Sequence, residues 1–290
     1  MKKFNNGNLK LAIQKEGRLT QDSLAFLRQT GLEFESYQKL LYSSCRNFPL
    51  EILYLRDDDI PNYVSTGVVD LGIAGQNILS EKREPVKKLL NLRFGFCSLV
   101  IAVPKDSPIK ILSDLNGKRI ATSYPNSSKV FFKKNNIQAD LVQVRGSVEI
   151  TPAIGVADAI IDLTSTGSTL ILQDLRVLTK IYDSEAVLVA NNDLSKNKKK
   201  LVNNIITRFK GVLSAKNYKY INLSAEEKIL PRLKKIIPVL GFQYFSFIPQ
   251  KGKVSVTSVI KEDIFWETIE KLKIMGIKRI LVLPIEKMII

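Results

Sequence analysis

The sequence predicts an α/β fold of two lobes followed by a smaller α+β domain. From Asn8 onward, short apolar runs alternate with longer amphipathic runs, which is typical of strands alternating with helices. A polar, lysine-rich stretch at 191–200 then leads into a C-terminal part with a different order of elements. The length of 290 residues suits two or three domains.

We expect the first lobe to comprise residues 1–104 and 183–210. Thr20 is a suitable N-cap for a helix over Thr20–Thr30, and Gly31 follows its end. The acidic residues of 56–61 suit the positive end of a second helix. The order strand, helix, strand favours parallel pairing. The strands expected are Leu9–Gln14, Leu50–Leu55, Val68–Ile73, Phe96–Val103 and Ala186–Ala190.

The second lobe is expected over residues 105–182, with its loops facing those of the first across a cleft in which ligands collect. Its helical segments are a turn at Leu112–Leu115 and a helix over Ser127–Asn135 that starts after Pro125. The strands expected are Arg119–Thr122, Leu141–Val144 and Ala159–Leu163.

The third unit, residues 211–290, follows a helix that runs to about Ala215. Its expected elements are a strand Tyr220–Leu223, a helix Ala225–Ile236, strands Tyr244–Ile248 and Val254–Ile260, a helix Ile264–Met275 and a strand Ile280–Leu283. This βαββαβ order is ferredoxin-like, or ACT-like. Small appended domains of this kind commonly sense a ligand, although a fold alone does not establish that role.

Composition excludes several classes of enzyme. The chain has 44 Lys and Arg against 28 Asp and Glu, a net charge of +16, and no histidine. A Ser-His-Asp or Cys-His triad, an imidazole base and a His-ligated zinc site are therefore impossible. Cys45 and Cys97 lie far apart, which indicates reduced core thiols. Without a signal-peptide pattern or a membrane-length apolar run, we expect a cytoplasmic protein with no membrane contact.

The positive charge is concentrated near the start of the third unit. Residues 195–235 hold twelve Lys or Arg and two Asp or Glu, a net charge of +10. Such a run indicates either a solvated helix face or an anionic partner such as nucleic acid. The chain has no zinc-finger or RNP-type motif that would favour nucleic acid.

The segment 149–170 carries the pattern most suggestive of chemistry. A short apolar strand ends at Asp162, and hydroxyl residues then surround Gly167, namely Thr164, Ser165, Thr166, Ser168 and Thr169. Hydroxyls and free backbone N–H groups at a helix start suit a phosphate, and the carboxylate suits the two hydroxyls of a ribose. An ordinary N-capping turn has the same composition. The loop lacks the lysine of a nucleotide-hydrolysing P-loop.

This segment, with Glu149, Gly155 and Asp158 at fixed offsets, resembles the signature of the ATP phosphoribosyltransferase family. The resemblance covers nearly the whole chain and identifies the long form, which carries a C-terminal regulatory domain. The other matching blocks are Ala12–Leu19, Leu55–Pro61, Val69–Ile73, Gly117–Pro125, Phe265–Thr268 and Leu283–Met288.

The resemblance implies a pentosyltransferase that catalyses the first step of histidine biosynthesis. N1 of the adenine of ATP displaces pyrophosphate from C1 of phosphoribosyl pyrophosphate (PRPP), giving phosphoribosyl-ATP with inversion. Mg²⁺ is the implied cofactor, with ligands that the sequence does not identify. The reaction needs positioning and charge stabilisation more than proton transfer, so the absence of histidine is no objection.

The resemblance also assigns roles to individual residues. Asp162, Lys15 and Arg18 receive catalytic roles, and Gln14, Arg56, Asp70 and Tyr124 the ATP site. The PRPP residues are Glu149, Asp158, Asp162, Thr164, Ser165, Thr166, Gly167, Ser168 and Thr169.

Each of these assignments has an ordinary alternative. A single basic residue is often merely solvated, an aspartate at a strand end is a common turn former, and a tyrosine before a proline often packs in a core.

Regulation and assembly follow from the same resemblance. The long form implies a homo-oligomer, a dimer or hexamer, that binds histidine as a feedback inhibitor, with Ser246 as the candidate hydroxyl.

Two other functions fit the pattern of elements. One is a non-catalytic solute binder, since the two lobes are also typical of periplasmic binding proteins. The other is a nucleic-acid-binding regulator, suggested by the basic segment; the family resemblance implies that nucleic acid is not a partner.

Overall fold

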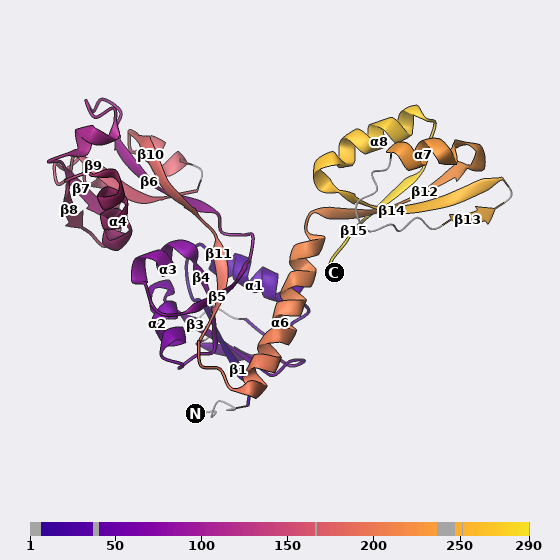
Figure 1. Ribbon diagram of the computed structural model, residues 1–290, viewed down its shortest axis with the longest axis horizontal. Helices are drawn as coiled ribbons and strands as arrows, with labels where there is room; N and C mark the ends of the chain where they lie inside the picture. The colour runs from indigo at the N-terminus through magenta and orange to yellow at the C-terminus, as the bar shows by residue number, and fades with distance from the viewer. Residues whose placement is uncertain (1–6, 37–40, 166, 237–246, 251, 290) are drawn as a thin grey trace. The chain divides into compact units, whose positions relative to one another are not determined.

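The computed structural model describes residues 7–36, 41–165, 167–236, 247–250 and 252–289 (Figure 1). The chain divides into two compact units, one of Met1–Arg28 with Leu32–Val202 and one of Gln29–Gly31 with Asn203–Ile290. The first unit contains two sheets and the second contains one. The predicted α/β class and the separate C-terminal sheet with helices are confirmed.

The first sheet has the strand order β2-β3-β1-β4-β11-β5. Strand β1 pairs in parallel with β3 and β4, whereas β2, β11 and β5 join antiparallel. The expected parallel pairing is therefore correct at the centre of this sheet. Its elements are β1 (Leu9–Gln14), α1 (Thr20–Gln29), β2 (Tyr42–Ser44), β3 (Leu50–Leu55), α2 (Ile60–Ser65), β4 (Leu71–Gly75), α3 (Gln76–Lys82), β5 (Lys87–Asn91) and β11 (Ala186–Ala190).

The second sheet has the strand order β10-β6-β9-β7-β8. Strand β7 pairs in parallel with β8 and β9, and β6 pairs antiparallel with β9 and β10. Its elements are β6 (Cys97–Pro104), β7 (Arg119–Thr122), α4 (Pro125–Asn135), β8 (Asp140–Gln143), β9 (Ala159–Thr164), α5 (Ser168–Leu172) and β10 (Leu175–Ser184).

Strand β6 corrects the expected lobe boundary at residue 104. The sequence placed this apolar run in the first lobe with a parallel neighbour, but it lies in the second sheet between two antiparallel neighbours. Most of its side chains are buried. A strand covered on both faces reads as a continuous apolar run in any sheet, so its composition does not identify its partner.

The C-terminal sheet has the antiparallel order β13-β14-β12-β15, which is the ferredoxin-like arrangement. Helices α7 and α8 pack on the sheet over a core that includes Leu233, Val256 and Leu272. The elements are α6 (Lys196–Ala215), β12 (Tyr218–Glu226), α7 (Leu230–Ile236), β13 (Phe247–Gln250), β14 (Lys253–Lys261), α8 (Phe265–Ile274) and β15 (Ile280–Pro284).

Two expectations for this unit need comment. The helix predicted from Ala225 starts at Leu230, because Ala225 and Glu226 still pair with β14. Most of the strand predicted at Tyr244–Ile248, including the candidate Ser246, lies outside the described residues. Within the described residues, every helix is too short or too polar to cross a membrane.

Candidate active site

In the first lobe, candidate residues follow the carboxyl ends of the parallel strands. Gln14 ends β1, and its buried side-chain oxygen accepts the backbone N–H of Leu19 at 2.9 Å. Gly17 has a φ of +131°, and a Cβ there would come within 2.5 Å of the Gln14 amide nitrogen. The turn therefore closes over Gln14, which makes this side chain a support of the loop that carries Lys15 and Arg18.

Arg56 and Lys15 stand at neighbouring strand ends of this lobe. Arg56 follows β3, which pairs directly with β1, and its side chain is exposed. Lys15 donates its backbone N–H to Leu55 at 2.7 Å, and its ammonium lies 3.7 Å from Glu16. Two cationic side chains thus share this edge of the sheet, where parallel α/β sheets usually bind ligands.

In the second lobe, Asp162, Tyr124 and Glu149 occupy the equivalent edge. Asp162 lies near the end of β9, Tyr124 follows β7, and Glu149 lies in the 3₁₀ turn Val148–Ile150 beyond β8. The pKa of Asp162 is raised to about 6, mainly by burial and also by the nearby Glu149, while a 2.8 Å bond from the Leu163 N–H opposes the shift. Perturbed carboxylates of this kind are typical of functional sites.

Tyr124 is packed rather than free. Its ring lies against the apolar core of the second lobe, and its hydroxyl accepts a 3.4 Å hydrogen bond from the Asn77 side chain. Burial raises the pKa of the Tyr124 phenol, and the charge of Asp162 adds to that effect. Asp162 and Tyr124 are therefore neighbours at the edge of this sheet, although 38 residues separate them in sequence.

The hydroxyl-rich loop begins directly after β9. The Thr164 hydroxyl accepts the backbone N–H of Gly167 at 2.8 Å, and Gly167 adopts a φ of +77° immediately before α5. This left-handed conformation favours glycine. Thr166 lies outside the described residues, and the backbones of Ser168 and Thr169 form the first turn of α5.

The Arg18 side chain connects the carboxyl edge of the first sheet to that of the second. The Arg18 guanidinium donates to the Ser165 hydroxyl at 3.4 Å and to the Phe96 carbonyl at 3.3 Å. Arg18 comes from the loop after β1, and Ser165 from the loop after β9. The carboxyl edges of the two sheets therefore meet at this contact, where the Arg18 guanidinium of the first lobe lies beside the Ser165 hydroxyl of the second.

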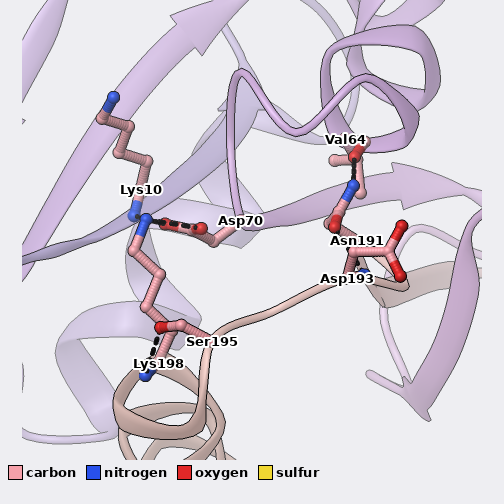
Figure 2. A network of polar contacts seen from close by, with 7 residues as sticks. All are labelled: Lys10, Val64, Asp70, Asn191, Asp193, Ser195 and Lys198. Atoms are coloured by element: carbon pink, nitrogen blue, oxygen red, sulfur yellow. Dashed lines mark hydrogen bonds and ion pairs between the residues drawn. The ribbon is translucent and has the colours of Figure 1, made fainter. Parts of the chain in front are cut away.

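Asp70 does not join this group. It precedes β4, and its carboxylate accepts the backbone N–H of Lys10 at 2.9 Å and binds the Lys198 ammonium at 2.8 and 3.0 Å (Figure 2). Only 4% of Asp70 is exposed. These contacts place Asp70, an expected ATP-site residue, at the amino edge of the sheet, where it has a structural role and lies apart from the other candidates. Its contacts join the starts of β1 and β4 to the start of α6.

Asp158 also lies at the amino edge of its sheet, and therefore apart from the phosphate loop. It precedes β9, its carboxylate accepts the Arg119 backbone N–H at 2.8 Å, and it lies 3.7 Å from the Arg119 side chain. The strand β9 separates it from Thr164. In the sequence pattern, Asp158 therefore marks the start of β9, whereas the phosphate loop follows the end of that strand.

The structure also brings forward residues that the sequence analysis missed. Asn77 and Glu81 of α3 contact the start of α4, and Ser184 holds Asn77. Beside them, residues including Gln76, Phe96 and Tyr182 line an open cavity of about 550 Å³. The sequence analysis did not predict α3, and nothing in the local sequence around Asn77 and Glu81 indicates their contacts with distant residues.

Comparison with known proteins identifies the family. A family profile described as ATP phosphoribosyltransferase matches residues 56–211, and the family's C-terminal domain matches residues 215–287. An ATP phosphoribosyltransferase of Cytophaga hutchinsonii is 43% identical over 97% of this chain and 98% of its own. The chain belongs to the ATP phosphoribosyltransferase family. The resemblance seen in the sequence is confirmed.

Two further relatives support the same membership. The ATP phosphoribosyltransferase of Parabacteroides distasonis is 41% identical over 97% of this chain and 100% of its own. The solved ATP phosphoribosyl transferase (HisG:HisZ) complex from Thermotoga maritima contains a chain that is 29% identical, with a TM-score of 0.60. The match spans 96% of the Thermotoga chain and 69% of this chain. This chain is therefore longer than the Thermotoga chain.

Proposed function

We propose that this chain transfers the phosphoribosyl group of PRPP to N1 of the adenine of ATP, releasing pyrophosphate. This is the reaction of its family and the first step of histidine biosynthesis. The observation that carries the assignment of the site is the meeting of two sheet edges through Arg18 and Ser165, with the partly buried Asp162 at the end of the same strand. The two other functions that the sequence left open have no comparable support.

PRPP is proposed to bind on the second lobe. The loop of Thr164 to Thr169 would receive its 5-phosphate on hydroxyls and on the backbone N–H groups at the start of α5. Asp162 lies within the same strand-loop segment, where its carboxylate accepts hydrogen bonds from the two ribose hydroxyls. Glu149 supplies a second negative charge next to the ribose. PRPP is taken as its magnesium chelate, since the family's reaction uses a divalent metal.

The first lobe is proposed to bind the more highly charged parts of both substrates. Arg18 is directed at the second lobe and suits the pyrophosphate group, while Lys15 and Arg56 suit the phosphates of ATP. Gln14 serves this site indirectly by holding the loop of Lys15 and Arg18 in place. From the second lobe, Tyr124 forms an apolar edge for the adenine ring.

The chemistry follows from this placement. The lone pair on N1 of adenine forms a bond to C1 of PRPP while the bond from C1 to the pyrophosphate oxygen breaks, with both electrons leaving on pyrophosphate. Positive charge develops on the ribose as the bonds exchange. The Asp162 and Glu149 carboxylates stabilise that charge in a partly buried site, and no imidazole base is needed.

The direct experiment is an assay of the purified chain with ATP, PRPP and Mg²⁺. We expect a new near-ultraviolet absorbing product and one pyrophosphate released per product formed, with no reaction when either substrate is omitted. Pyrophosphate release without ATP, or product formation at the same rate by Asp162→Asn, would contradict the assigned site.

The C-terminal unit is proposed to be a regulatory domain of the long form, working in a homo-oligomer, a dimer or hexamer, rather than with a separate partner chain. The support is the match of residues 215–287 to the family's C-terminal domain and the ferredoxin-like sheet. Isothermal titration with histidine tests this role. We expect saturable heat and inhibition of turnover, and the absence of heat at millimolar histidine would argue against feedback through this domain.

A further inference from the structure

The start of helix α4 is capped by a side chain from the other lobe. The first N–H groups of a helix have no partner within the helix. In α4, Tyr124 occupies the N-cap position without a capping bond from its own side chain. The backbone N–H groups of Asn126 and Ser127 instead donate to the two carboxylate oxygens of Glu81, each at 2.9 Å. Glu81 belongs to α3, beside the first sheet.

Glu81 is suited to this contact by burial and charge. Only 7% of Glu81 is exposed, so its two hydrogen bonds compete little with water. A carboxylate at the positive end of an 11-residue helix is also stabilised by the helix dipole. Around it, the Asn126 side chain donates to the Glu81 carbonyl, and Arg83 donates to the Asn126 carbonyl, both at 3.0 Å.

The same face of α3 holds the side chain of Tyr124. Asn77 lies one helical turn before Glu81 and donates to the Tyr124 hydroxyl. Asn77 is itself fixed by Ser184, which exchanges two 3.0 Å hydrogen bonds with it. The ring of Tyr124 is thus held at its hydroxyl by Asn77, and the backbone that follows it is held by Glu81.

We propose that Glu81 is a positioning residue that sets the affinity for ATP by fixing Tyr124 and the start of α4 against the first lobe. This inference rests on the proposed function, in which Tyr124 borders the adenine of ATP. Glu81 itself is not among the residues proposed to contact either substrate. The PRPP loop after β9 has no hydrogen bond to Glu81 among the described contacts, so its binding should respond much less.

Steady-state kinetics of Glu81→Gln test the proposal. Glutamine keeps the size of the side chain but replaces one acceptor oxygen with an NH₂ group that faces a backbone N–H. We expect KM for ATP to rise roughly tenfold, the effect of losing one charge-assisted hydrogen bond, and KM for PRPP to stay within about twofold of the wild-type value. Glu81→Asp, which keeps the charge on a shorter side chain, should give an intermediate KM for ATP.

Asp114→Asn is the matched control. The Asp114 carboxylate also accepts two backbone N–H groups, from Lys110 at 2.8 Å and Ile111 at 3.1 Å, but all three residues belong to the second lobe. We expect both KM values to remain at the wild-type level in this variant. A purely structural role of Glu81 would lower the melting temperature and the amount of active enzyme without separating the two KM values.

The outcomes are distinct. If the wild-type chain forms no product, the proposed function fails whatever Glu81 does. If the wild-type chain is active and Glu81→Gln leaves KM for ATP unchanged, or raises both KM values by the same factor, only the role of Glu81 is overturned. Should Glu81→Gln not fold, the KM values of Glu81→Asp decide in the same way.

Discussion

Aspartates at opposite edges of the sheets of the first unit have opposite surroundings. At the amino edges, Asp70 and Asp158 each precede a strand and accept the backbone N–H at the start of the neighbouring parallel strand. Each also lies near a basic side chain, Lys198 or Arg119. At the carboxyl edge, the Asp162 carboxylate accepts only the N–H of Leu163 among the described contacts, and burial raises its pKa to about 6.

The difference separates structure from function. Both carboxylate oxygens of Asp70 are bonded within the fold, and one oxygen of Asp158 is, so these two groups stabilise the fold. The carboxylate of Asp162 is partly desolvated and has no cation bonded to it among the described residues, so its ionisation costs folding free energy and leaves lone pairs for a substrate. Variants that remove the charge of one of these aspartates test whether its main effect is on activity or on stability.

The largest effect is expected from Asp162→Asn. We expect kcat/KM to fall by a factor on the order of 10²–10³, as for loss of a group that stabilises transition-state charge. The melting temperature near pH 8 should be unchanged or higher, because the variant removes a partly buried charge. Calorimetry and initial-rate assays on the same preparation measure both. A large drop in melting temperature with retained activity per folded molecule would contradict the ribose role.

Asp70→Asn should show the reverse pattern. Removing the charge leaves Lys198 without its carboxylate, and we expect a loss of about 2–3 kcal/mol in the free energy of unfolding, reduced from the fully buried case because Lys198 is 25% exposed. Urea unfolding measures the loss. The kcat/KM per folded molecule should stay within about twofold of the wild-type value. A hundredfold fall in kcat/KM in a stable variant would indicate that Asp70 belongs to the active site.

Acid should reduce activity through Asp162. Its pKa of about 6 in the folded chain lies above the ordinary 3.8, so the carboxylate becomes protonated as pH falls below 6 and no longer accepts the ribose hydroxyls. We expect kcat/KM for PRPP to fall about tenfold per pH unit below that point and to be level above it. Stability has the opposite sign: the contribution of Asp162 is greatest below pH 3.8 and is lost as pH rises through 6.

Glu149→Gln sharpens this prediction. The charge of Glu149 raises the pKa of Asp162, so its removal should move the acid limb of the pH profile to lower pH. The pH dependence of kcat/KM for the two enzymes, measured side by side, gives the shift. An acid limb at the same pH in both would mean that Asp162 does not control it.

The smallest effect is expected from Thr164→Val. Valine keeps the shape of threonine but removes the oxygen that accepts the Gly167 N–H. We expect KM for PRPP to rise about fivefold, in line with one neutral hydrogen bond, and KM for ATP to be unchanged. Initial rates with each substrate varied in turn measure the two constants. Equal changes in both would indicate a general disturbance of the second lobe.

Much of the fold and part of the site could be predicted from local sequence. Strands such as Leu9–Gln14 and helices such as Thr20–Gln29 were expected almost at their observed bounds, because side-chain periodicity and capping residues are local. The segment from Asp162 to Thr169 was recognisable because a strand end and its following loop are continuous in the chain. The structure places Asp70 and Asp158 before their strands, apart from the other candidates, because a motif does not show which long-range partner a carboxylate has.

The sequence by itself determined the α/β class, the ferredoxin-like C-terminal unit, the family and the exclusion of histidine chemistry, since these depend on composition, order of elements and contiguous motifs. Only the tertiary structure decided the sheet to which β6 belongs, the capping of α4 by Glu81 and the structural role of Asp70. It also decided the burial that raises the pKa of Asp162. Each depends on contacts between residues distant in the chain, whose pairing follows from strand register and packing rather than from local pattern.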